Sequence, residues 1–121
     1  MEPYLPQKRS PMQESAYYLV ASLFALHTKT SDSGNLGNHM RSCNPNPEKE
    51  PQKEDALDRR FTALLAAHPD DLAEYLRHAI SFLKSKEIPV NWNQLFWDLQ
   101  NWDDDDRRVQ KKWANAFWGR I

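Results

Sequence analysis

Acidic, histidine and cysteine side chains are the residues of this sequence with the most capacity for chemistry. Residues 103–106 are four consecutive aspartates, and carboxylates are the ligands that hard cations such as Mg²⁺ and Ca²⁺ prefer. Consecutive positions on a helix point in different directions, so at most two of these carboxylates could share one ion. Negative charge also stabilises a helix that begins just after it. We therefore interpret the run as a helix start and predict no metal site there.

Cys43 is the one cysteine of the chain, and His39 lies four residues before it. On a helix the two side chains would share a face, which suits a zinc site or a nucleophile with its base. No second close pair completes a tetrahedral zinc set, and no helix start behind the thiol would lower its pKa. We predict no catalytic residue, no metal and no cofactor, so the chain is not expected to be an enzyme. A small metalloenzyme is the least favoured alternative.

The charge of the chain is almost balanced, with 16 basic and 17 acidic residues. Any affinity for nucleic acid must therefore come from how the charges are distributed. The longest apolar stretch, residues 16–26, is too short to cross a membrane, and residues 1–10 lack the apolar core of a signal peptide. Together with the single cysteine, these features predict a cytoplasmic protein without membrane contact.

Apolar residues recur at helical spacing along nearly the whole chain, and no segment alternates with period two. Main helices are expected over residues 11–27, 55–68, 70–83 and 91–102 and from 107 onward, with a short turn at 38–42. The strongest stripe repeats every three or four residues. It consists of Leu72, Tyr75, Leu76, Ala79, Ile80 and Leu83. The sequence predicts an all-α fold, a compact bundle of about five main helices.

Residues 44–54 contain three prolines and no apolar side chain, so this segment cannot bury anything. We interpret it as a flexible connector that could divide the protein into two small lobes. Residues 11–43 would form the first helix and loop of the helical domain, and residues 55–121 a C-terminal helical bundle. Residues 1–10 are expected to be an extended or disordered N-terminus.

Five tryptophans fall within the last thirty residues, and core packing accounts for Trp102 and Trp113. At 100° per residue, Trp118 lies nearly opposite Trp113, on a face that also carries basic residues. Such a face suits contact with nucleic acid, docking on a protein, or a solvated surface with one stray aromatic. A fainter basic row includes Arg77 and Lys84. That row fits simple complementarity to helix dipoles equally well.

Residues 60–65, 72–83 and 84–92 resemble the small subunit of the type I-E CRISPR complex Cascade, the CasB family. The ordered series of tryptophans and the Ile88-Pro89-Val90 break carry the same likeness. Upstream, the Asn35-Leu36-Gly37 loop does so too, and the resemblance extends over most of residues 16–118.

The resemblance implies an all-helical, non-enzymatic subunit that is present as a pair. Its implied partners are the backbone and large subunits of Cascade, a second copy of itself, crRNA and target DNA. It would brace the crRNA–target hybrid and help to hold the displaced strand, a task that needs shape and charge but no reading of bases. The alternative is a helical protein–protein interaction module without nucleic-acid contact, anchored by Trp97 and Trp118.

We chose the candidate site residues by their charge and by the helix face on which we expect them. For nucleic-acid contact they are Arg41, Arg59, Arg60, Arg77, Arg107, Arg108, Lys111 and Lys112, and for partner contact Trp97 and Trp118.

Overall fold

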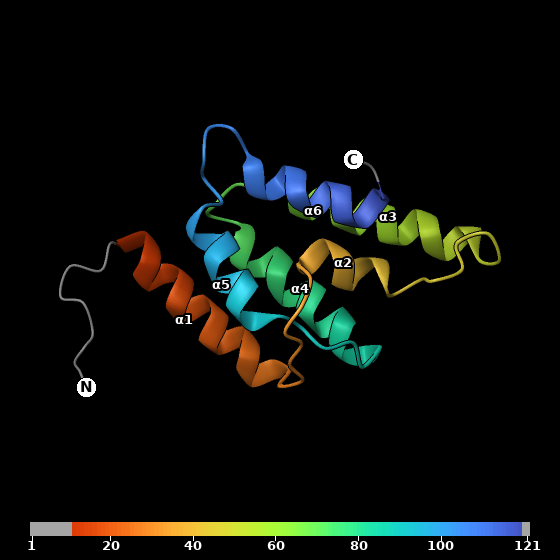
Figure 1. Cartoon of the computed structure of the whole chain (residues 1–121), viewed down its shortest axis with the longest axis horizontal. Helices are drawn as coiled ribbons and strands as arrows, with labels where there is room; N and C mark the ends of the chain where they lie inside the picture. The colour runs from red at the N-terminus through yellow and green to blue at the C-terminus, as the bar shows by residue number, and fades with distance from the viewer. Residues whose placement is uncertain (1–10, 120–121) are drawn as a thin grey trace.

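A computed structural model describes residues 11–119, and within them the chain forms six helices (Figure 1). They are α1 (Pro11–Leu26), α2 (Leu36–Arg41), α3 (Pro51–Leu65), α4 (Leu72–Ser85), α5 (Trp92–Gln100) and α6 (Arg108–Trp118). The described range contains no strand, only an isolated parallel bridge between Thr30 and Val90. The all-α prediction is confirmed. The prediction for residues 1–10 lies outside the described residues.

The helix starts follow local side-chain chemistry. Asn91 caps α5, where its side-chain oxygen accepts the N–H of Gln94 at 3.2 Å. At α2, Asn35 and Asn38 each accept the backbone N–H of the other, which satisfies two of the N–H groups that a helix leaves free at its N-terminus. The break and cap expected near residues 89–91 are therefore confirmed.

The segment between α2 and α3 differs from its prediction. Helix α3 begins at Pro51, four residues before the expected start at Asp55, because proline is well tolerated in a first helical turn. Glu54 is thereby placed on the helix, where it pairs with Arg41 at 2.7 Å and accepts the side-chain N–H of Asn44 at 3.2 Å. Asn44 itself is buried. Residues 44–54 are thus joined to the rest of the protein by polar contacts, which cannot be predicted from the number of apolar residues in the segment.

A single hydrophobic core takes side chains from all six helices. Helix α2, which precedes the connector, packs mainly against α6, which follows it. Helix α1 packs against α4 and α5, and Figure 1 shows α6 and α3 running together on the other side of α2. Within residues 11–119, the helices before and after the connector therefore share one core.

The loop after α1 is tied to the segment that leads into α5. The backbone N–H of Val90 donates to the carbonyl of Lys29 at 3.1 Å, and that of Ser31 donates to Val90 at 2.9 Å. The Trp92 indole N–H reaches the Lys29 carbonyl at 3.1 Å. These bonds hold α5 beside α1 and fix which side chains the pair presents outward.

No helix among the described residues has the length and apolarity needed to cross a membrane.

Candidate nucleic-acid interface

The outer face of α6 carries the strongest group of exposed cations predicted from the sequence. Helical geometry places Arg108, Lys111 and Lys112 on one side, opposite the buried Trp113 and Phe117, and all three cations are exposed. Among the described residues, Lys111 and Lys112 form no ion pair. The predicted orientation of the last helix is confirmed, and its cations face solvent.

Arg108 is exposed but not free. Its Nε donates to Asp104 Oδ2 at 3.1 Å and its Nη2 to Asp104 Oδ1 at 3.2 Å. The guanidinium lowers the pKa of the Asp104 carboxyl, mainly through these hydrogen bonds, and the carboxylate raises the pKa of Arg108. Because the Arg108 side chain is largely exposed, the pair contributes little stability and a phosphate could compete for the guanidinium.

Trp118 is less free than the sequence indicates. Its indole N–H donates to Asp58 Oδ1 on α3, and its ring contacts Phe61 and Phe117 edge-on. Its exposed fraction is 37%. Trp118 therefore joins α6 to α3, with one edge left in solvent, and does not stand alone among the cations of the outer face.

Arg107 precedes α6 and does not lie on it. It adopts a left-handed backbone conformation (φ 52°), and its guanidinium donates to the carbonyl of Leu65 at 2.8 Å. That carbonyl belongs to the last turn of α3, where carbonyl groups have no partner within the helix. Arg107 thus caps α3 and serves structure in this arrangement.

Arg41 is also engaged inside the protein. Besides its ion pair with Glu54, it donates to the Asn44 carbonyl at 2.8 Å and lies over the Phe117 ring at 5.1 Å. The carboxylate raises the pKa of Arg41, and the guanidinium in turn lowers the pKa of Glu54. Arg41 links α2, α3 and α6, so its position is explained without a ligand.

The remaining predicted cations lie on different faces of the molecule. Arg59 points outward from α3, whereas its neighbour Arg60 reaches toward α4 and covers the Phe82 ring at 5.0 Å. Arg77 shares a side of α4 with Lys84, which borders a depression near the end of α1. The structure therefore separates the candidate cations into an α6 face, an α3–α4 group and an α4–α1 group.

Cys43 and His39 are not hydrogen-bonded as a nucleophile and its base; the Cys43 thiol contacts the backbone carbonyl of His39 at 3.9 Å. Burial raises the pKa of the Cys43 thiol to about 11, which keeps it protonated near neutrality. The His39 Nε2 accepts the backbone N–H of Asn91 at 3.0 Å, and burial lowers the pKa of this imidazole. The ring is thus occupied by a structural bond, and the thiol is not activated. The described residues contain no cluster of three or more potential metal ligands.

An exposed aromatic patch lies where α1 meets α5, and it includes the predicted anchor Trp97. We call Tyr17, Tyr18, Phe96 and Trp97 the α1–α5 patch; the Phe96 ring is 6.4 Å from Tyr17 and 6.3 Å from Trp97. Trp97 is 61% exposed. The sequence did not lead us to predict Tyr17 and Tyr18 as surface residues. The segment 16–26 nevertheless carries apolar and aromatic residues all around the helix, which indicates a second apolar surface.

Comparison with known proteins identifies the family. A family profile described as CRISPR-associated protein Cse2 matches residues 1–118. The chain belongs to the Cse2 family. The Cse2 protein of Thermus thermophilus is 31% identical over 120 residues, which cover 98% of this chain and 66% of that protein. The resemblance to the CasB family is thereby confirmed.

Solved structures of Cse2 and CasB proteins share the fold. The crystal structure of CasB from Thermus thermophilus matches with a TM-score of 0.78 and 28% identity, over 92% of this chain and 65% of that one. CasB of M. ruber matches with a TM-score of 0.77 and 26% identity, over 93% and 68%. CasB of Thermobifida fusca, at 23% identity and a TM-score of 0.80, shows the fold alone. This Cse2-family chain spans about two thirds of the length of the Thermus relatives.

Proposed function

We propose that this chain is a non-catalytic small subunit of a CRISPR RNA-guided surveillance complex, Cascade. In this role it braces the crRNA–target DNA hybrid and stabilises the displaced strand in antiviral defence. Its partners are the backbone and large subunits, a second copy of itself, crRNA and target DNA. The membership in the Cse2 family carries this proposal.

The outer face of α6 supports the nucleic-acid part of the proposal. Lys111 and Lys112 are exposed and unpaired among the described residues, and the exposed Arg108 is held by a single, half-buried carboxylate, that of Asp104. Such cations bind phosphates without reading bases, because each contact releases counterions from the nucleic acid. A subunit of an RNA-guided complex needs this kind of contact, since base pairing supplies the sequence specificity.

Salt dependence of DNA retention tests the proposal. The assembled complex with wild-type chain should hold single-stranded DNA with an affinity that falls as salt rises, by roughly 0.7 log units per log unit of salt for each phosphate contact. The double variant Lys111→Ala/Lys112→Ala should bind more weakly, and its slope should be shallower by about 1.4 for two lost contacts.

The matched control removes two lysines that are already paired. Lys29 pairs with Glu87 and Lys53 with Glu50, so Lys29→Ala/Lys53→Ala changes the net charge equally while leaving the α6 face intact. This control should keep the wild-type slope. Equal slopes for both double variants and the wild type would contradict nucleic-acid contact through α6.

The α1–α5 patch favours the alternative of a protein-binding module without nucleic-acid contact. Exposed tryptophan and tyrosine side chains are common anchors of protein interfaces; Trp97 is largely exposed and Tyr17 about half exposed. In that case the Lys111→Ala/Lys112→Ala variant would assemble with its partners and retain DNA as the wild type does. The same experiment therefore separates the two functions.

A further inference from the structure

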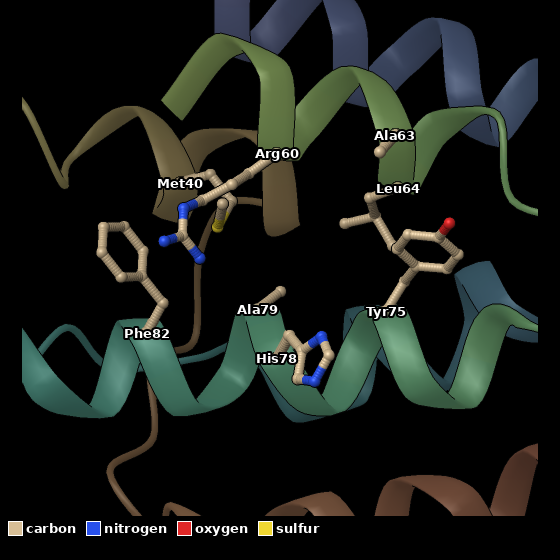
Figure 2. A pocket seen from close by; sticks show the side chains of 8 residues that line it. All are labelled: Met40, Arg60, Ala63, Leu64, Tyr75, His78, Ala79 and Phe82. Atoms are coloured by element: carbon tan, nitrogen blue, oxygen red, sulfur yellow. The ribbon is translucent and has the colours of Figure 1, made fainter. Parts of the chain in front are cut away.

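A cavity of about 200 Å³ lies between α3 and α4, and none of the α6 cations lines it (Figure 2). Ala63 of α3 and Ala79 of α4 border it, and these two small side chains leave space between the helices. Tyr75 and Phe82 stand at its two ends, and Met40 and Leu64 back it with apolar surface. A cavity of roughly 150 Å³ lined by apolar side chains can hold benzene, so a flat ring has the right size for this space.

Apart from the Tyr75 hydroxyl, the polar side chains that line the cavity are Arg60 and His78. Arg60 reaches down from α3 with its guanidinium over the Phe82 ring, and the imidazole of His78 lies at the rim (Figure 2). None of the lining residues carries a carboxylate. The site therefore combines aromatic surface, a flat cation held by a ring, and an electrostatic preference for an electron-rich or anionic guest.

We propose that this cavity receives one base of single-stranded DNA, with the flanking phosphates near Arg60 and the outward-pointing Arg59. The inference rests on the proposed function and names an additional contact for the same kind of strand. Bases freed from a duplex stack on aromatic side chains and on guanidinium planes, and such stacking tolerates any sequence. An aromatic side chain of a protein would fill the space equally well but would bring no negative charge to meet the two arginines.

Filling the cavity is the direct test. Ala63 is exposed, so Ala63→Leu adds volume to the opening without entering the core and without changing the charge. The probes are a short oligodeoxythymidylate and the abasic strand of the same length, which keeps the phosphates and lacks the bases. The wild-type chain should bind the thymidylate strand roughly tenfold more tightly than the abasic strand, and Ala63→Leu should lose most of this preference.

Two neighbouring arginines supply a second test that does not depend on filling the cavity. Arg60→Gln removes a cation that lines it, and Arg59→Gln removes the same charge one residue away, outside it. Both variants should weaken binding of the abasic strand alike, through lost attraction of phosphates. Only Arg60→Gln should also reduce the preference for strands that carry bases. Thermal denaturation of each variant establishes that it is folded.

The outcomes distinguish this inference from the proposed function. Salt-dependent DNA binding that is the same for thymidylate and abasic strands would overturn the base site and leave the proposed function standing. Equal behaviour of Arg59→Gln and Arg60→Gln would also overturn it. If Ala63→Leu blocks assembly with partner subunits and leaves the preference for the thymidylate strand unchanged, the cavity binds a protein and the base site is overturned. If the assembled complex retains no DNA through this chain, the proposed function and the base site both fail.

Discussion

His39 shows how a single side chain can hold two distant segments together. Its Nε2 accepts the backbone N–H of Asn91, the residue that caps α5, and the Asn91 side chain in turn donates to the Gly34 carbonyl at 3.0 Å. Only the neutral imidazole can accept the Asn91 N–H, and burial lowers the pKa of His39. His39, a possible zinc ligand or base by its residue type and spacing, is therefore a structural hydrogen-bond acceptor.

This arrangement predicts a loss of stability on mild acidification. The unfolded chain binds a proton at His39 near its ordinary pKa of about 6.5, whereas the folded chain resists protonation. The contribution of His39 is thus complete above about pH 6.5 and is lost as the pH falls toward the lower pKa of the folded state. In urea titrations, the free energy of unfolding should fall between about pH 7 and pH 5.5 by more for the wild type than for His39→Gln.

The control for this prediction is His68→Gln, which removes an exposed histidine from the loop between α3 and α4. It should keep the wild-type pH dependence. A pH dependence that survives in His39→Gln would show that another group is responsible.

At the scale of single residues, the sequence shows the chemical type of a side chain and the face of its helix, but not which residue it contacts. Arg41 was predicted to contact nucleic acid because it is a cation after a loop, yet it is tied to Glu54, which lies in a segment interpreted as a connector. Trp118 was placed correctly on the side of α6 opposite Trp113, but its partner Asp58 is 60 residues away. Periodicity reports direction within a helix and contains no information on which helix lies next to it.

Helices are predicted best where a continuous stripe and a side-chain cap coincide. The expected α4 stripe is observed apart from Tyr75, which is exposed, and Leu76, Ile80 and Leu83 are fully buried. Asn91 caps α5 as expected. Helix α3 starts earlier than predicted because its first turn is stabilised by Pro51 and by an ion pair, neither of which produces an apolar pattern. Apolar periodicity can therefore locate a helix while misplacing an end that is held by polar contacts.

Gly37 sets how closely α2 approaches α6. A methyl group added at Gly37 would lie 2.2 Å from the carbonyl oxygen of Trp113, well inside van der Waals contact. Because the obstacle is backbone, a change of rotamer cannot relieve it. We expect Gly37→Ala to lower the free energy of unfolding by about 3 kcal/mol, at the upper end of the usual cost of overpacking. Chemical denaturation measures the change.

Gly119→Ala is the control, because it replaces a glycine at a position where an added methyl group meets no neighbouring atom. Gly119 has a φ of 69°, which disfavours a side chain, but no atom lies within 4 Å of an added methyl group. Gly119→Ala should therefore cost only about 1 kcal/mol, from the left-handed backbone alone. Equal costs at the two positions would mean that α2 and α6 can move apart without penalty.

For the whole molecule, the main consequence of the fold is a separation of surfaces. Helices α6 and α3 run together on one side of α2, and α1 lies on the other side, packed against α5 (Figure 1). A molecule with nearly balanced charge thereby presents a basic face and an aromatic face apart from each other. This separation fits the proposed subunit, with one surface for nucleic acid and another for protein, and it allows the two surfaces to be mutated separately.

Trp97 provides the prediction at this scale. Because 61% of the Trp97 surface is exposed, Trp97→Ala should change the free energy of unfolding by no more than about 0.5 kcal/mol. If Trp97 anchors an interface with a partner subunit, the same change should weaken assembly by about 2 kcal/mol, close to thirtyfold. Leu26→Ala, at an exposed apolar residue outside the α1–α5 patch, should affect neither quantity. Titration of purified variants against the remaining subunits measures assembly, and wild-type affinity for Trp97→Ala would exclude this anchor.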